Sequence, residues 1–310
     1  MLVIEHLRKE YKNLVALDDL SFTLEPGDIF GFIGPNGAGK TTTIRMVATL
    51  LVPTSGTAYV DGIDVTRYPD EVRSLMGYMP DFFGVYDDVK VWEYLDFFAA
   101  AYRIPKTQRA QVINDVLELT DLTVKRDSYV EELSRGMKQR LCLAKTLVHD
   151  PKLLLLDEPA SGLDPRARIE LKELLKALRD MGKTILISSH ILPELADFCN
   201  KIGIIEKGKM LLFGGVNEIL RQINGGRGVR VRLAEGDDLD KATEVLQAIP
   251  GVNSVNRDGR EIEVTLDHEQ AQQHTLLAAL ITAGFRVESC AETQLNLEDL
   301  FMTVTQGAVQ

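Results

Sequence analysis

The chain has 310 residues, of which 45% are hydrophobic and 26% are charged, and its formal net charge is −11. This length and composition predict a globular protein of one or two domains with ample apolar material for a core. The negative charge argues against a nucleic acid as the main partner, because binding to nucleic-acid phosphates requires a basic face.

Three cysteines, Cys142, Cys199 and Cys290, are widely separated and form no C-x-x-C pair. This spacing is typical of free thiols in a reducing compartment. The N-terminal residues lack the basic start and the apolar stretch of a signal peptide, and no apolar run approaches the length of a membrane span. We therefore expect a soluble, cytoplasmic protein.

Residues 1–222 alternate strand-like and helix-like segments, as in an α/β fold. Early strands are predicted at Leu2–Leu7, Leu20–Leu24 and Thr57–Val60. Residues 88–150 are predicted to be mostly helical. Two amphipathic helices are expected in that region, with apolar faces formed by Val91, Leu95, Phe98 and Tyr102 and by Val112, Val116 and Leu119.

A short apolar strand, Ile29–Ile33, leads into a segment that matches the pattern G-x-x-x-x-G-K-[ST] and is followed by a helix-like run. The segment consists of Gly34, Pro35, Asn36, Gly37, Ala38, Gly39, Lys40 and Thr41, with Thr42 next in the chain. Glycines let the backbone point N–H groups at phosphate oxygens, and the following helix directs its positive dipole end at the same anion. Because Lys40 can reach the β- and γ-phosphates and the Thr41 hydroxyl can ligate Mg²⁺, the segment predicts a site for ATP or GTP.

Acidic residues follow the predicted buried strand Leu153–Leu156 at its carboxyl end, which is where ligands bind in parallel sheets. Asp157 can hold the Mg²⁺ shell, and Glu158 can polarise an attacking water. Two polar segments, Ser161–Asp164 and Ser188–His190, are expected at the same edge of the sheet.

A second anion-binding helix start is predicted where Leu133–Gln139 precedes an amphipathic helix, Arg140–Leu147. Ser134 and Gly136 are the small polar residues expected there. After a Gly-rich linker at residues 223–228, residues 229–310 follow a β-α-β-β-α-β order that predicts a small α+β, ferredoxin-like domain. A last helix is expected at Leu297–Val304.

The order of these motifs resembles that of the ATP-binding cassette (ABC) family, the ATPase subunits of ABC transporters, from Leu2 to about Gly215. The resemblance implies a P-loop NTPase fold with a mixed sheet core, an antiparallel β subdomain and a helical subdomain. It assigns five motifs: Walker A at Gly34–Thr41, Walker B at Leu153–Glu158, the signature at Leu133–Met137, the D-loop at Ser161–Asp164 and the switch histidine at His190. It also places Tyr11 against the adenine ring, whereas by itself Tyr11 would more often be a core residue.

The same resemblance implies a mechanism in which two cassettes meet head to tail around Mg-ATP. Ser134 and the Gly136 N–H would serve the γ-phosphate held by Lys40 of the partner subunit. His190 would contact the γ-phosphate bound by its own chain. ATP would close the dimer, and hydrolysis would open it.

Three residues, Asp81, Arg135 and Met137, depart from the usual family pattern, and Met137 stands where Gln is commoner. Asp81 stands where Gln is usual, and its carboxylate could still approach Mg²⁺ or the attacking water. Arg135 stands where Gly is commoner, and it would either add charge near the partner's phosphate or point to solvent. The apolar run Phe82–Tyr86 would either lie near the groove that receives a helix of the membrane subunit or cover the helical subdomain.

The C-terminal region, with its motif Asn296–Phe301, resembles the extension of bacterial drug-resistance and polysaccharide exporter ATPases. We therefore expect the ATPase subunit of an exporter, acting as a homodimer at the cytoplasmic face of the membrane under a separately encoded permease. The C-terminal domain would serve dimerisation or regulation. The alternatives are a soluble ABC ATPase of translation or DNA repair, and a nucleotide-gated interaction module.

Overall fold

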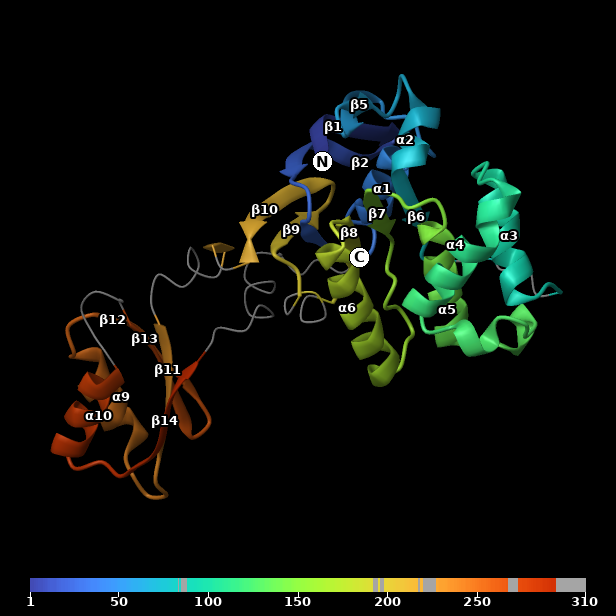
Figure 1. Cartoon of the computed structure of the whole chain (residues 1–310). Coiled ribbons are helices and arrows are strands. Elements are labelled where there is room, and N and C mark those ends of the chain that lie inside the picture. The colour runs from blue at the N-terminus through green and yellow to red at the C-terminus, as the bar shows by residue number, and fades with distance from the viewer. Residues whose placement is uncertain are drawn as a thin grey trace. The chain divides into compact units, whose positions relative to one another are not determined.

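The computed structural model in Figure 1 describes residues 1–82, 84, 88–191, 195, 198–216, 218–219, 227–266 and 273–293. The chain forms two compact units, residues 1–216 and residues 217–310. No helix among these described residues is long and apolar enough to cross a membrane.

The first unit begins with a four-stranded antiparallel sheet in the order β2-β1-β4-β5. Its strands are β1 (Leu2–Tyr11), β2 (Leu14–Leu24), β4 (Ser55–Val60) and β5 (Ile63–Asp64). Alternate side chains of β1 and β2 are buried, as in an antiparallel sheet with one face on the core. Both strands extend past the predicted Leu2–Leu7 and Leu20–Leu24, because their exposed outer halves stay paired as far as Tyr11 and Leu14.

The second sheet of this unit has six strands in the order β10-β9-β3-β8-β7-β6. Its parallel strands are β3 (Ile29–Ile33), β6 (Met76–Met79), β7 (Leu153–Leu156), β8 (Thr184–Ser189) and β9 (Lys201–Glu206), and β10 (Lys209–Gly215) is antiparallel to β9. Every residue of β3 and β7 is buried, which explains their continuous apolar sequences. The neighbouring β3, β8 and β7 therefore place their carboxyl ends at one edge of the sheet.

Helix α1 (Lys40–Val47) packs between the two sheets, where its Ile44, Met46 and Val47 join one core with residues of both. Helix α2 is Pro69–Leu75. Helix α6 (Pro165–Asp180) begins after Asp164, because the Asp164 side chain accepts a hydrogen bond from the Ala167 N–H at 2.9 Å. These helices hold the strand-to-helix loops on a rigid core.

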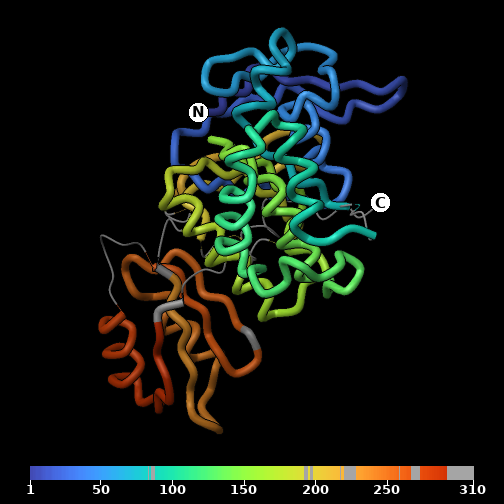
Figure 2. Tube along the Cα trace, turned by 45° about the vertical axis from the view of Figure 1, so that its right-hand side comes forward, coloured from blue at the N-terminus to red at the C-terminus, as the bar shows by residue number. Residues whose placement is uncertain are grey.

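A helical subdomain is formed by α3 (Val91–Ala101), α4 (Lys106–Leu119) and α5 (Arg135–Leu147), which contact one another. Figures 1 and 2 show them as a blue-green to green group. The buried face of α4 differs from the predicted one. Its buried residues are Ile113, Val116 and Leu117, because the helix packs against both α3 and α5. Helix α5 also begins at Arg135, five residues before the predicted start, because the Ser134 hydroxyl caps it by accepting from Met137 N–H at 3.3 Å.

The second unit has the predicted β-α-β-β-α-β order and an antiparallel sheet, β12-β13-β11-β14. The elements are β11 (Arg227–Leu233), α9 (Leu239–Gln247), β12 (Val252–Asp258), β13 (Glu261–Leu266), α10 (Gln273–Thr282) and β14 (Val287–Thr293). Alternate residues of β11 and β13 form a core with the apolar faces of both helices. This is the α+β, ferredoxin-like arrangement. The expected helix Leu297–Val304 lies outside the described residues.

One histidine joins the helical subdomain to the central sheet. The ring of His149, just after α5, stacks on the ring of Tyr102 with centroids 3.7 Å apart and an interplanar angle of 7°. Its Nε2 lies 2.9 Å from the Met76 carbonyl, and its buried Nδ1 has no hydrogen-bond partner in the described part of the chain. Burial lowers the pKa of His149, and Lys183 adds to this effect, although the Met76 contact and Asp150 oppose it.

Because the folded pKa is depressed, we expect acid to destabilise the first unit through His149. The imidazole of His149 takes up a proton near pH 6.5 in the unfolded chain, and at a lower pH in the folded chain. The stability that neutral His149 contributes above pH 6.5 is therefore lost as the pH falls through the folded pKa. In urea titrations between pH 7.5 and 5, the free energy of unfolding of His149→Gln should fall less steeply with decreasing pH than that of the wild type. The exposed-histidine control His274→Gln should keep the wild-type slope, and an equal slope in both variants would contradict this assignment.

Candidate functional site

Three loops meet at the carboxyl edge of the central sheet. They follow β3, β7 and β8, which are neighbours in the sheet order. The loop after β3 holds residues 34–39, the loop after β7 holds residues 157–164, and His190 follows β8. Segments far apart in the sequence therefore share one site, as expected for an α/β sheet.

The loop between β3 and α1 is closely packed against its surroundings. A Cβ added to Gly34 would overlap the carbonyl of Ile205 in β9, and one added to Gly39 would lie 2.9 Å from the carbonyl of Ala16. Gly39 also has φ +111°, a conformation that favours glycine. Both positions need glycine, so the loop can lie directly on the strands behind it.

The hairpin turn Lys207–Gly208 supports the same loop from behind. The Gly208 N–H donates to the Ala38 carbonyl at 2.9 Å, and the Gly208 carbonyl accepts from the Asp18 N–H at 2.9 Å. The β9–β10 hairpin therefore connects the loop to β2. This backing holds the loop's shape without using its outward surface.

A cavity of about 400 Å³ opens over the loop. The predicted site residues that line it are Tyr11, Asn36, Gly37, Ala38, Gly39, Lys40, Thr41, Thr42, Asp81, Glu158 and His190. Leu14, Ala16 and Ser161 also line it. Gly34 and Pro35 are not among the lining residues, but their carbonyls hold the Lys40 side chain.

Lys40 is almost completely buried at the base of this cavity, with 5% of its surface exposed. Its Nζ donates to the Gly34 carbonyl at 2.6 Å and to the Pro35 carbonyl at 3.3 Å. The same atom lies 3.4 Å from Glu158 Oε1. The ammonium group is therefore fixed in place by the loop that surrounds it.

Asp157 is buried between the loop and the β8 strand. Its Oδ1 accepts from Ser188 Oγ at 2.7 Å and from Thr41 Oγ1 at 3.2 Å. Its Oδ2 is buried and has no hydrogen-bond partner among the described residues. Burial raises the pKa of Asp157, the two hydroxyls oppose this, and the negative charges of Asp81 and Glu158 raise it further.

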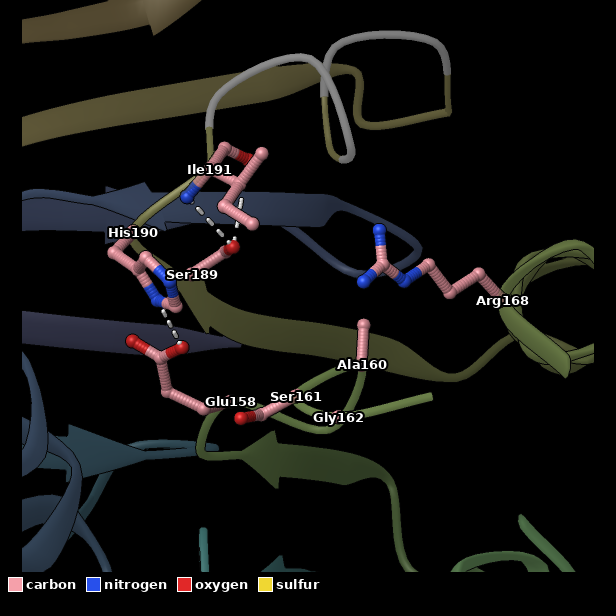
Figure 3. A pocket seen from close by; sticks show the side chains of 8 residues that line it. All are labelled: Glu158, Ala160, Ser161, Gly162, Arg168, Ser189, His190 and Ile191. Carbon is pink, nitrogen blue, oxygen red and sulfur yellow. Dashed lines mark hydrogen bonds and ion pairs between the residues drawn. The ribbon is translucent and has the colours of Figure 1, made fainter. Parts of the chain in front are cut away.

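Glu158 faces His190 across the cavity. His190 Nδ1 lies 2.6 Å from Glu158 Oε2, and the Glu158 N–H donates to Ser188 Oγ at 2.9 Å. Figure 3 shows this pair at one end of a second, smaller pocket of about 150 Å³, beside the loop Ala160–Gly162. Glu158 has φ +50°, a left-handed conformation that is strained for a non-glycine residue. Its neighbours hold the carboxylate at the cavity wall.

The other predicted residues occupy two different places. Tyr11 stands at the cavity with 44% of its surface exposed, so it is not a core residue. Lys9 Nζ lies 5.2 Å from the centroid of its ring. Ser134 and Gly136 lie at the start of α5 and are not among the described residues that line the chain's own cavity.

Sequence reasoning did not predict Leu14 and Ala16 at the cavity. They belong to β2, and only the packing of the antiparallel sheet beside the loop brings them there. Their strand carries no motif that could have identified them. Ser161 was placed in the D-loop, but its position at the cavity depends on the turn in which its N–H donates to the Glu158 carbonyl at 3.0 Å.

Comparisons with known proteins agree with this geometry. Residues 17–161 match the family described as ABC transporter, and residues 214–305 match the C-terminal domain of ATP-binding protein DrrA1-3-like. The chain is 34% identical over 306 residues to the Nod factor export ATP-binding protein I of Cupriavidus metallidurans, covering 98% of this chain and 97% of that protein. It is 30% identical over 308 residues to the linearmycin resistance ATP-binding protein LnrL of Bacillus subtilis, covering 98% of each chain.

Solved structures show the same cassette. An ATP-binding subunit of an ABC transporter matches with a TM-score of 0.66 and 28% identity, over 78% of this chain and 97% of that one. A dimeric ATP-binding cassette in a post-hydrolysis state with ADP and Pi has the same fold, with a TM-score of 0.64 and 24% identity over 70% of this chain and 99% of that one. With the phosphate loop, the buried aspartate and the Glu158–His190 pair assembled at one sheet edge, the chain belongs to the family of ATP-binding subunits of ABC transporters.

Proposed function

We propose that the chain is the ATP-hydrolysing subunit of an exporter and drives a separately encoded permease. Members of its family are ATPases coupled to transport, and they pair with membrane permeases and dimerise. The names of the relatives, Nod factor export and linearmycin resistance, favour an exporter over a role in translation or DNA repair. The observation that carries the proposal is the buried Oδ2 of Asp157 beside the phosphate loop, which has no hydrogen-bond partner among the residues that the structure describes.

The phosphates of ATP would lie over residues 34–42, with the adenine near Tyr11. Lys40 is presented at the base of the cavity by two loop carbonyls, and helix α1 begins at the same residue. A polyanion at this position would gain the lysine charge, the helix dipole and loop N–H groups. Tyr11 offers an exposed ring face at the cavity, and stacking of a base on such a face is worth ~1–3 kcal/mol.

The residues around Asp157 fit a Mg²⁺ ion. Asp157 offers a buried carboxylate oxygen without a partner in the described residues, and Thr41 offers a hydroxyl that now donates to the other oxygen. Asp81, at the same cavity, would be the third ligand. Oxygen ligands of this kind suit Mg²⁺, and the bound ion would neutralise charge on the phosphates.

Glu158 would act as the general base on the attacking water. Its carboxylate reaches the cavity, and its contacts with Lys40 and His190 fix its direction. His190 would contact the γ-phosphate and would lose this contact when the phosphate leaves. Because a base must be within hydrogen-bond reach of the water, the close packing around Glu158 favours this role.

The cassette would close as a dimer of two identical chains. Ser134 and Gly136 lie at the N-terminus of α5, a 13-residue helix whose dipole can attract an anion, and they are separate from the chain's own cavity. A second copy would present them to the ATP held by the first. Closure then follows from the charge of ATP, which both copies are needed to neutralise.

The permease would dock on a groove between the central sheet and the helical subdomain. A cavity of about 250 Å³ lies there, lined by Leu50, Met76, Tyr78, Phe98 and Tyr102 among others. Leu50 on this groove is 60% exposed, whereas Phe82, which is 87% exposed, is not among the described residues that line it. Exposed apolar side chains that border a groove favour a protein partner. This arrangement supports a place at the cytoplasmic face of the membrane.

The proposed division of the chain is a cassette at residues 1–222 with a helical subdomain at about 88–150, a linker at 223–228 and a C-terminal domain at 229–310. The two compact units divide after Val216, and β11 begins at Arg227, so residues 227 and 228 of the proposed linker belong to the sheet of the C-terminal domain. The C-terminal domain would serve dimerisation or regulation. Its match to the DrrA1-3-like domain supports the link to exporters.

The metal assignment predicts that Asp157→Asn removes the Mg²⁺ dependence of nucleotide binding. Asparagine keeps an acceptor for Ser188 and Thr41 but carries no charge. Calorimetric titration with ATP should show a Mg²⁺-dependent gain in affinity in the wild type and none in the variant, and turnover should fall at least ~100-fold. Asp150→Asn, which alters an exposed carboxylate, is the control. An unchanged Mg²⁺ effect in Asp157→Asn would refute this ligand.

The dimer mechanism predicts that Glu158→Gln binds Mg-ATP and stays closed. Glutamine keeps the shape of the side chain but cannot accept the proton of water, so turnover should fall ~10²–10⁴-fold. Light scattering should then show a dimer only with Mg-ATP. Glu173→Gln, an exposed position on α6, should behave as the wild type. Rapid turnover in Glu158→Gln would remove this residue from the role of base.

The position of Asp81 predicts that Asp81→Gln changes stimulation by the permease more than it changes basal turnover. The substitution removes a negative charge that raises the pKa of Asp157 and restores the amide usual in the family. Phosphate release should be compared with and without the permease in vesicles. A basal loss as large as that of Asp157→Asn would instead make Asp81 a full metal ligand.

A further inference from the structure

Arg135 of the signature turns back onto its own chain. It is the first residue of α5, and its Nη2 donates to the Ser161 carbonyl in the loop after β7 at 3.3 Å. A Cβ added to Gly162 would overlap the same guanidinium group, so the group lies directly over this glycine. Arg135 is exposed to solvent, as one of the two alternatives from the sequence expected, but the contact with its own chain was not predicted.

The contacted loop carries Glu158. The Ser161 N–H donates to the Glu158 carbonyl at 3.0 Å, while the Ser161 carbonyl accepts from Arg135. One peptide segment therefore connects the start of α5 to the residue with the strained φ of +50°. Ser161 also lines the nucleotide cavity with Glu158 and His190. A shift of Arg135 would thus move residues of the cavity wall.

The rest of this loop is held by α6. Arg168 Nε donates to the Leu163 carbonyl at 3.1 Å, and Asp164 caps the helix. In Figure 3 the Arg168 side chain extends toward Ala160 on the loop. Two arginines from two helices therefore hold two carbonyls of the loop, and Arg135 is the one that comes from the helical subdomain.

The start of α5 is also packed on this region. The Cβ position of Gly136 faces Ala167 Cβ at 3.6 Å and Leu163 Cδ2 at 3.8 Å. Farther along, Arg140 of α5 pairs with Glu170 of α6. The helix that carries Ser134 and the loop that follows Glu158 are thus in direct contact at more than one point.

We propose that Arg135 is a positioning residue that couples the signature to Glu158 within one chain. In this role it acts through the Ser161 peptide and contacts neither the nucleotide nor the attacking water. This inference rests on the proposed function, in which a second copy's ATP engages Ser134 and Gly136. When the second copy's ATP contacts the start of α5, Arg135 positions the loop that carries Glu158 in the same chain. The general base of each chain therefore responds to the ATP bound by the other chain.

The test is the ATP turnover and dimerisation of Arg135→Ala in the full chain. Loss of one charge-assisted hydrogen bond should lower kcat about three- to tenfold, with KM for ATP unchanged, because ATP binding to the chain's own cavity does not use Arg135. Arg135→Lys, which retains a donor and the charge, should recover part of kcat. Arg166→Ala, which removes an exposed arginine of α6 paired with Glu170, should match the wild type.

A second measurement separates this role from a contact with the partner's phosphate. In the Glu158→Gln background, Arg135→Ala should form the ATP-dependent dimer at the same ATP concentration and with the same salt dependence. Weaker dimerisation would overturn the proposal in favour of direct phosphate binding, and a wild-type kcat in Arg135→Ala would overturn it outright. If Glu158→Gln alone fails to dimerise, the proposed function fails instead. Equal melting temperatures would show that neither result reflects misfolding.

Discussion

The nucleotide site depends on a buried carboxylate, one oxygen of which has no hydrogen-bond partner in the described part of the chain. Asp157 sits beneath the cavity with two hydroxyls on one oxygen, and Asp81 and Glu158 add negative charge nearby. Lys40 is the cation placed against this group of acids, and its ammonium is shared among Glu158 and two carbonyls. A charge removed from water without compensation is unfavourable. A site built in this way is stabilised most by a ligand that supplies both a cation and a polyanion.

Rigid and adjustable parts are separated in this unit. The strands β3 and β7 are fully buried, and they carry the phosphate loop and Asp157 at their ends. The residue after Asp157 is the strained one, and the loop beyond it is held by side chains from two helices. Strain at such a point persists only where the surroundings enforce it. Glu158 is therefore the part of the site whose geometry the neighbouring helices can control.

Local patterns in the sequence predicted much of the site. The phosphate loop, Asp157, Glu158 and His190 each follow a buried strand, and the parallel order of the strands brings them together. The Asp164 cap was also predictable, because its effect extends over three residues. The approach of Leu14 and Ala16, the buried face of α4 and the direction of Arg135 were not predictable. Each depends on packing between elements distant in the sequence, which one-dimensional patterns do not record.

The hairpin behind the phosphate loop has a consequence for how the protein is made. Every residue that lines the cavity except His190 is present once residue 161 has been synthesised. Ala16 of β2, which packs behind Gly39, is made early, but Ile205 and Gly208 come much later, and the Gly208 backbone links Ala38 of the loop to Asp18 of β2. During translation the chain would therefore hold its phosphate-loop sequence long before that sequence could take its shape. We therefore expect the phosphate loop to reach its full nucleotide-binding shape once β9 and β10 have been added.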